Sequence, residues 1–295
     1  LFFFLIFNKA DVLWSNDLDT LLPNFIMSRF KSCKLVYDSH EYFTESVTKK
    51  GSKKVWELIE RILFPHLENV ITVNNSIKEV YEKHYRVSIT VIRNLPYELT
   101  PTFSTKPLLP ADKKILVMQG NGLNENRGAE EAVLTMQYLP DEFMLYFIGG
   151  GTILNHLKLM TNRLKLNNTI AFIGLLPYEE MMEYTRQCFL GLIFEKIHVS
   201  DEHRFSLPNK FFDYIHAGIP VLSSKAVEIK SIVEEFQIGT FIESFDPKEI
   251  AKIVVDLSAN EKIYNQWKQN TIVAAREFNW ENEEKILIHF MNNLS

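Results

Sequence analysis

The segment that decides the fold is Ser206-Leu-Pro-Asn-Lys-Phe-Phe-Asp-Tyr-Ile-His-Ala-Gly-Ile-Pro220, followed by the apolar run Val221-Leu-Ser223. Pro208 is suited to the start of a helix, because the N–H that proline lacks has no helical partner there. Gly218 is suited to end the same helix, since many helices terminate in a residue with left-handed backbone. The segment therefore predicts a short helix that leads directly into a strand.

Strand-like and helical stretches alternate around this segment, which is typical of βαβ units with a parallel sheet. The predicted strands are 114–118, 144–148, 170–173, 190–194, 221–223 and 239–242. Helical patterns lie between them, at 128–139, up to 164, at 178–187 and at 208–216. A further helix is expected after Asp246-Pro-Lys-Glu249, which combines an N-cap, an N1 proline and a capping-box acid. This alternation predicts a six-stranded doubly wound α/β domain over 113–275.

Residues 1–97 predict a smaller α/β domain, with strands at 11–14, 34–37, 70–73 and 89–92. A helix is expected over 52–67, and Ser76-Ile-Lys-Glu79 matches a capping box at the start of the next one. A matching Rossmann-type domain would have six strands, so we expect this domain to be incomplete. Four prolines among polar residues mark 98–112 as a linker. Residues 276–295 are expected to form a separate amphipathic helix.

Composition and charge exclude some classes of protein. The net charge is -5 with both signs interspersed, which argues against a nucleic-acid partner. Cys33 and Cys188 stand far apart and fit neither a disulfide framework nor a zinc site, so we expect a reducing cytoplasm. The apolar run at 1–7 is much shorter than the roughly 20 residues that span a bilayer. It is interpreted as the tail of a core helix or, alternatively, as an edge that touches a membrane.

The helix that begins near Pro208 has the chemistry of a phosphate site. Ligands of open parallel sheets bind at the carboxyl ends of the strands, where this helix would present its first turn. Free backbone N–H groups and the positive end of the helix dipole favour an anion there, and Lys210 adds a formal cation. Asp213, one turn further on, can accept hydrogen bonds from ribose hydroxyls. The same residues also fit an ordinary capped helix with an exposed Lys–Asp pair.

The 206–221 segment resembles the donor-binding helix of family 4 glycosyltransferases, of the form S-x-P-N-K-x-F-E-Y-x-x-x-G-x-P-V. The stretch Asn121–Gly128 resembles the loop after the first strand of that family's donor domain. Arg127 then occupies the basic position that contacts the donor diphosphate. Three further stretches resemble the second glycine turn, the wall of the nucleobase and the end of the acceptor domain: 149–151, 172–178 and 93–96.

The resemblance implies a GT-B fold, with two Rossmann-like domains facing a cleft and the final helix packing back on the first domain. It implies that Arg127 and Lys210 stabilise the leaving diphosphate, that the substrate is a nucleoside diphosphate sugar, and that no cofactor or metal is needed. The donor-binding residues that it implies are Gly120, Asn121, Gly149, Gly150, Phe172, Ile173, Ser206, Asn209 and Asp213.

One position departs from the family pattern. Asp213 matches the second acid of the family's E-x7-E motif, but eight positions earlier the chain has Phe205 rather than an acid. The first glutamate normally holds hydroxyls of the donor sugar, so the sugar is left open. Asp201 or Glu202, from the same loop, is an alternative source of that acid.

The acceptor side of the site is expected in the first domain. His40 follows the strand 34–37 and resembles the histidine that the family places beside the donor sugar; alternatively, it is a loop histidine bonded to Asp38 or Glu41. We expect Glu41 on the acceptor side. Asp17 and Asp19 form an Asp-x-Asp pair that could chelate a divalent cation, but we interpret them as helix-capping or acceptor-facing groups.

The resemblance predicts a retaining, metal-independent glycosyltransferase of the hexosyltransferase type, acting in cell-surface polysaccharide or glycolipid synthesis. Its acceptor would be a sugar, a polysaccharide or a lipid-linked group, and it would work in the cytoplasm or at the inner face of the membrane. Two alternatives stay open: an epimerase of the same fold, which would turn over donor alone, and an inactive partner that binds the nucleotide sugar without transfer.

Overall fold

The computed structural model describes residues 1–46, 50–98 and 108–294. Most of the predicted linker at 98–112 therefore lies outside the described residues. The chain divides into two compact units. The first unit comprises residues 1–94, 200–205 and 280–295, and the second comprises 95–199 and 206–279. Each unit is described by itself below.

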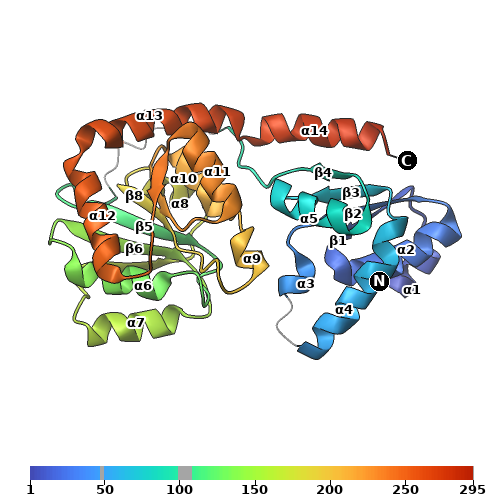
Figure 1. Ribbon diagram of the computed structural model, residues 1–295, viewed down its shortest axis with the longest axis horizontal. Coiled ribbons are helices and arrows are strands. Elements are labelled where there is room, and N and C mark those ends of the chain that lie inside the picture. The colour runs from blue at the N-terminus through green and yellow to red at the C-terminus, as the bar shows by residue number, and fades with distance from the viewer. Residues whose placement is uncertain (47–49, 99–107, 295) are drawn as a thin grey trace. The chain divides into compact units, whose positions relative to one another are not determined.

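The first unit is built on four parallel strands in the order β1-β2-β3-β4 (Figure 1). They are β1 (Val12–Asn16), β2 (Lys34–Ser39), β3 (Asn69–Thr72) and β4 (Ile89–Val91). Its helices are α1 (Phe2–Phe7), α2 (Asp17–Lys31), α3 (Phe43–Ser46), α4 (Lys50–Leu63), η1 (Phe64–His66), α5 (Asn75–Tyr85), α9 (Asp201–Arg204) and α14 (Trp280–Asn292). The prediction of a smaller, four-stranded first domain is confirmed.

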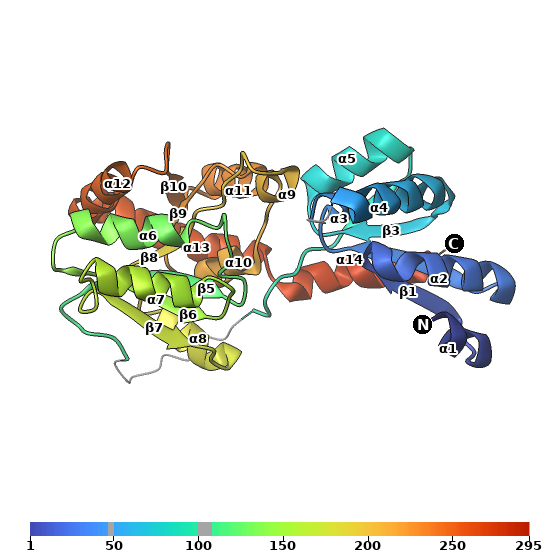
Figure 2. The ribbon, with the colours of Figure 1, turned by 90° about the horizontal axis from the view of Figure 1, so that it is seen from below.

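Alternating strand residues give this sheet two apolar faces. Tyr37 and Val70 contribute to a core with side chains of α2, α4 and α5. Val36 and Ile71 point to the opposite face, where they pack with Leu287 and other residues of α14. The ribbon shows helix α14 beside the sheet of this unit (Figure 2). Because successive side chains of a strand point to opposite faces, each strand supplies both cores.

Two local predictions for this unit were wrong. The helix after β3 begins at Asn75, one residue before the predicted capping box, because the Asn74 side chain accepts the Ile77 N–H at 2.9 Å. Asparagine is among the best N-cap residues, so the earlier start satisfies the first turn. The second wrong prediction concerns the run at 1–7, which we interpreted as the tail of a core helix. It forms helix α1, but Leu5 is the one α1 residue that is buried, and Phe3 is 78% exposed.

The second unit holds a six-stranded parallel sheet in the order β10-β9-β8-β5-β6-β7. The strands are β5 (Lys114–Gly120), β6 (Phe143–Gly149), β7 (Ile170–Gly174), β8 (Leu190–Ile193), β9 (Val221–Ser223) and β10 (Gly239–Phe241). The helices are α6 (Ala129–Thr135), η2 (Met136–Tyr138), α7 (Leu154–Arg163), α8 (Tyr178–Thr185), α10 (Asn209–Ala217), α11 (Val227–Phe236), α12 (Pro247–Ala259) and α13 (Glu261–Glu277). The predicted six-stranded doubly wound domain is confirmed.

Helices cover both faces of this sheet. Residues of α6, α7 and α12 form one core, and residues of α10, α11 and α13 form the other (Figure 1). Leu116 and Met118 of β5 face the first core, whereas Ile115 and Val117 face the second. A strand buried on both faces reads as a continuous apolar run, which is why this stretch of sequence does not alternate.

The strand order fixes where a ligand site is expected. The chain moves from β5 to β6 and β7 on one side of the sheet and then returns to β8 on the other side of β5. This reversal creates a topological switch point at the carboxyl ends of β5 and β8, where open α/β sheets bind their ligands. The fold is α/β with two Rossmann-like parallel sheets. Within the described part of the chain, no helix is both long and apolar enough to cross a bilayer.

Candidate active site

The loops at the carboxyl ends of β5 and β6 lie in direct contact. Gly149 has φ +125°, and a Cβ added there would lie 2.2 Å from the carbonyl oxygen of Gly120. The N–H of Gly150 donates to the same oxygen at 3.1 Å. Only glycine permits both this backbone conformation and this approach. The predicted donor residues Gly120, Gly149 and Gly150 therefore lie in close backbone contact at the carboxyl ends of β5 and β6, next to the switch point.

Helix α10 presents its first turn without a side-chain cap. It begins at Asn209, with Pro208 as the N-cap residue, and it ends at Gly218, whose φ of +74° is left-handed. Pro208 supplies no side chain that could accept the N–H groups of the first turn. These donors and the positive end of the helix dipole suit an anion.

Asp213 of α10 lies in a network of buried hydrogen bonds. Tyr178 donates its hydroxyl to Asp213 Oδ1 at 3.0 Å, and Gln119 donates its amide to Oδ2 at 3.1 Å. The Gln119 oxygen in turn accepts the Thr185 hydroxyl at 2.6 Å. Burial raises the pKa of Asp213 to about 6, although both hydrogen bonds oppose the rise. Each carboxylate oxygen can accept a second hydrogen bond, so the side chain keeps capacity for a ribose hydroxyl.

Arg127 and Lys210 are the two cations predicted to contact the donor. Arg127 Nη1 donates to Glu195 Oε1 at 2.9 Å, and the Glu195 side chain is buried. Lys210 lies in the first turn of α10 and is also buried. Burial lowers the pKa of Lys210, the Glu195 charge opposes that effect, and the Arg127 charge adds to it. Three charged groups from three separate segments thus lie close enough to act on one another, with Glu195 and Lys210 buried and Arg127 partly exposed.

The remaining predicted donor residues are spread around these groups. Phe172 stacks on Phe147 of the neighbouring strand, with ring centroids 5.2 Å apart. Ile173 packs against the core that includes α10. Asn121 and Asn209 are exposed and Ser206 is half-buried.

Phe205 belongs to the first unit. Its ring packs against that unit's core, and its carbonyl oxygen accepts the Asn74 side-chain amide at 2.9 Å. Asp201 and Glu202 lie in α9 of the same unit, and Asp201 forms an ion pair with Arg204 at 3.7 Å.

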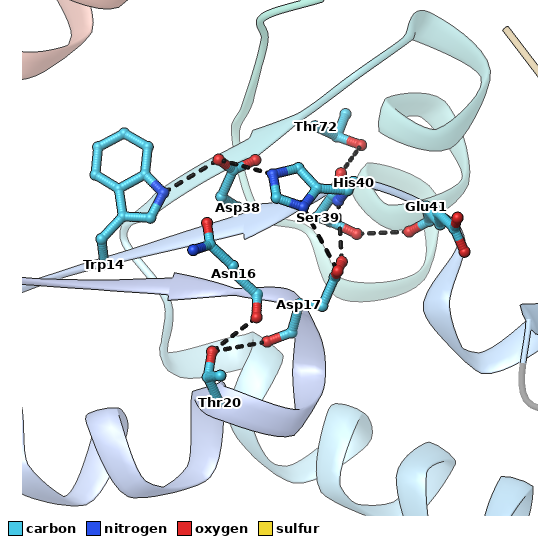
Figure 3. Close-up of polar contacts among 9 residues, drawn as sticks. All are labelled: Trp14, Asn16, Asp17, Thr20, Asp38, Ser39, His40, Glu41 and Thr72. Atoms are coloured by element: carbon cyan, nitrogen blue, oxygen red, sulfur yellow. Dashed lines mark hydrogen bonds and ion pairs between the residues drawn. The ribbon is translucent and has the colours of Figure 1, made fainter. Parts of the chain in front are cut away.

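His40 is held between two carboxylates in the first unit (Figure 3). Its Nδ1 lies 3.5 Å from Asp17 Oδ2, and its Nε2 lies 3.3 Å from Asp38 Oδ2. The Asp17 and Asp38 hydrogen bonds raise the pKa of His40 to about 10, against the opposing effect of burial. His40 is therefore an imidazolium at neutral pH and has only N–H donors to offer.

The backbone of the first unit builds this clamp. Asn16 pairs with Asp38 in the register of β1 and β2, so the carboxyl ends of the two strands lie side by side. Asp17 follows directly with φ +57°, and its Oδ1 accepts the backbone N–H of His40 at 3.0 Å. A non-glycine residue in this left-handed region costs free energy that its surroundings must offset. Trp14 donates to Asp38 Oδ2 at 3.1 Å and fixes the second carboxylate.

The two other residues predicted on the acceptor side do not join this clamp. Asp19 is exposed in the first turn of α2, and the Glu41 side chain is exposed while its carbonyl oxygen accepts the Ser39 hydroxyl at 2.7 Å. Of the two roles expected for Asp17 and Asp19, helix capping is contradicted, because no side chain caps α2 and the Asp17 carboxylate accepts the His40 N–H instead. The acceptor-facing role stays a prediction.

Sequence reasoning missed Glu195 and Gln119. Glu195 directly follows the predicted strand 190–194, and Gln119 immediately precedes the glycine that ends β5. A polar side chain at the carboxyl end of a buried parallel strand is the signal that could have identified both.

The two Rossmann-like sheets and the glycine turns are those of a GT-B-type protein. Comparison with known proteins identifies the family. Residues 100–273 match the model of the family described as "Glycosyl transferases group 1". The match spans more than half of the chain, and we conclude that the chain belongs to this family. No curated protein is significantly similar to it in sequence.

Solved structures share the fold at low sequence identity. HepE from Anabaena, in complex with UDP-glucose, aligns with a TM-score of 0.77 and 14% identity, over 96% of this chain and 79% of HepE. Sucrose-phosphate synthase from Thermosynechococcus elongatus aligns with a TM-score of 0.78 and 14% identity, over 96% of this chain and 73% of that protein. WaaG, a glycosyltransferase involved in lipopolysaccharide biosynthesis, aligns with a TM-score of 0.65 and 14% identity, over 89% of this chain and 79% of WaaG. These likenesses establish the shared GT-B fold.

Proposed function

We propose that this protein transfers a hexose from a nucleoside diphosphate sugar to an acceptor hydroxyl, with retention of the anomeric configuration and without a metal ion. The observation that carries the proposal is the charged cluster at the uncapped first turn of α10, in which Lys210 and Glu195 are buried and Arg127 is partly exposed. It lies in the unit whose switch point is expected to bind a ligand.

The chemistry of the leaving group explains why such a cluster is useful. Breaking the bond between the anomeric carbon and the diphosphate leaves an additional negative charge on the nucleoside diphosphate. Arg127, Lys210 and the N–H groups of α10 are preorganised donors, and charge stabilisation by such donors is strong where they are shielded from water, as Lys210 is. These groups would therefore stabilise the departing diphosphate in place of a metal ion.

The other residues have roles in holding the donor. Asp213, fixed by Tyr178 and Gln119, would accept hydrogen bonds from the ribose. His40, as an imidazolium, would donate a hydrogen bond to the sugar once one of its two carboxylates is displaced. HepE was solved with UDP-glucose, which makes a UDP-sugar the first donor to test.

The acceptor and the location are proposed from the same comparisons. WaaG is involved in lipopolysaccharide biosynthesis, which supports a sugar, polysaccharide or lipid-linked acceptor in cell-surface polysaccharide or glycolipid synthesis. We propose that the protein works in the cytoplasm, at the inner face of the membrane when the acceptor is lipid-linked.

A turnover assay tests transfer against the alternatives. The protein is incubated with UDP-, GDP- or ADP-linked hexoses, with and without a mixture of cell-surface glycan acceptors, in buffer containing a chelator. Release of nucleoside diphosphate that depends on acceptor, together with a product of unchanged anomeric configuration, supports the proposal. A new nucleotide sugar formed from donor alone would instead show an epimerase. Nucleotide binding with no turnover would show an inactive partner.

A further inference from the structure

Glu195 is a buried carboxylate with one oxygen unused. It follows β8 at the switch point, and its side chain is 1% exposed. Its Oε1 accepts the Arg127 guanidinium at 2.9 Å. Its Oε2 is buried and makes no hydrogen bond within the part of the chain that the structure describes. A buried carboxylate oxygen without a hydrogen bond costs free energy, because buried polar atoms normally have partners, and this one therefore calls for an explanation.

The surroundings of Lys210 show what the charge of Glu195 does. Lys210 is buried in the first turn of α10, and the charged groups that act on it are Glu195, Arg127 and Asp213. Burial and the Arg127 guanidinium disfavour a charged lysine, whereas the two carboxylates favour it. Of these carboxylates, Asp213 has a pKa of about 6 and already accepts hydrogen bonds from Tyr178 and Gln119. The charge of Glu195 favours the protonated form of Lys210 more strongly than the charge of Asp213 does.

We propose that Glu195 is a positioning residue of the donor site, which fixes the Arg127 guanidinium and keeps Lys210 protonated so that both cations are ready for a nucleoside diphosphate. This inference rests on the proposed function. Two neighbouring cations repel each other, and the negative charge of Glu195, which acts on both, offsets that repulsion before the ligand arrives. Both cations are then already in place when the ligand binds, so binding requires less rearrangement of the site.

The test compares UDP binding by the wild-type protein and Glu195→Gln, using calorimetric titration from about pH 6 to about pH 9, because burial lowers the pKa of Lys210 from its ordinary value. Glutamine keeps the shape and an acceptor for Arg127 but removes the charge. The pKa of Lys210 then falls, and its protonated fraction is lost at high pH. The Kd of Glu195→Gln divided by that of the wild-type protein should rise from a few-fold at about pH 6 to about tenfold or more at about pH 9. A tenfold change corresponds to the loss of one hydrogen bond to a charged group.

Three controls separate positioning from a structural role. Glu142→Gln changes the net charge equally at an exposed ion pair with Lys114 and should leave Kd unchanged. Glu195→Asp restores the charge and should restore most of the pH profile. In a Lys210→Met background, Glu195→Gln should no longer alter the pH dependence, because the group through which it acts is absent.

The outcomes are distinct. A Kd ratio that stays constant with pH, or tighter binding by Glu195→Gln, overturns this inference while leaving the donor site in place. A folded wild-type protein that binds neither UDP, GDP nor ADP overturns the proposed function itself.

Discussion

Replacing Lys210 with methionine should affect stability and binding in opposite directions. Lys210 is buried, and burial lowers its pKa, so the folded state carries the cost of desolvating an ammonium group. Methionine has a similar volume and no charge. Glu195 keeps its bond to Arg127 in the variant, so no buried carboxylate is left without a partner. Because the Arg127–Glu195 ion pair stays intact, losing the desolvation cost of the ammonium group should leave the free energy of unfolding unchanged or raise it.

The effect on nucleotide binding is expected to be a loss. A hydrogen bond to a charged group contributes about 2 kcal/mol, which corresponds to a Kd about 30-fold weaker. At a UDP concentration of about 100 Kd, the wild-type protein gains about 2.7 kcal/mol, and the variant at the same concentration gains about 1 kcal/mol. For a unit of this size, these gains correspond to increases in Tm of roughly 5–10 °C and 2–4 °C.

Thermal unfolding with and without UDP measures both effects. We expect an unliganded Tm for Lys210→Met equal to or above that of the wild-type protein, with the UDP-induced shift reduced by more than half. Lys230→Met, which removes an exposed lysine of α11, is the matched control. The reasoning is refuted if Lys210→Met lowers the unliganded Tm by several degrees while the UDP-induced shift is unchanged, since Lys210 would then be a structural residue.

Further predictions concern the glycine turn, the buried acid and the histidine clamp. Gly149→Ala places a Cβ 2.2 Å from the Gly120 oxygen at a left-handed φ, so we expect a loss of about 3 kcal/mol in the free energy of unfolding, measured by urea denaturation, together with weaker UDP binding. Burial raises the pKa of Asp213 to about 6, so its ionisation destabilises the fold as pH rises from about 4 through about 6. Asp213→Asn should therefore be more stable than the wild-type protein by up to about 2–3 kcal/mol at about pH 7, with the difference gone near about pH 4; equal stability at both pH values would contradict the raised pKa. His40, with a pKa raised to about 10, should stabilise the first unit below about pH 6.5 and lose that contribution as pH rises through about 10. An NMR titration of the imidazole should show this pKa falling in Asp17→Asn, and an unchanged value would remove Asp17 from the clamp.

The strand–helix alternation was enough to predict both sheets, because parallel strands buried on two faces leave apolar runs such as 115–118. The exact starts of helices were less certain. Ser76 matched a capping box in sequence, yet Asn74 stands two residues earlier and caps the helix with its side chain. Two overlapping cap signals compete at this point, and a pattern alone does not rank them.

The candidate site could be predicted only where its residues lie on one continuous segment of the chain. Lys210 and Asp213 share a helix, so their spacing was visible in the sequence. The partnership of Arg127 with Glu195 joins positions 68 residues apart and depends on β5 and β8 being neighbours in the sheet. The clamp on His40 likewise depends on the pairing of β1 with β2 and on the left-handed backbone of Asp17. Sheet order and backbone conformation decide such contacts, and neither has a local sequence signal.

The most direct test of the central claim is a calorimetric titration of the wild-type protein with UDP, GDP and ADP. The account predicts saturable binding of one of the three, with a one-to-one stoichiometry and with the affinity reduced about 30-fold in Lys210→Met. A folded protein that binds none of the three, or that binds its nucleotide equally well after Lys210→Met, would contradict the donor site described for the second unit.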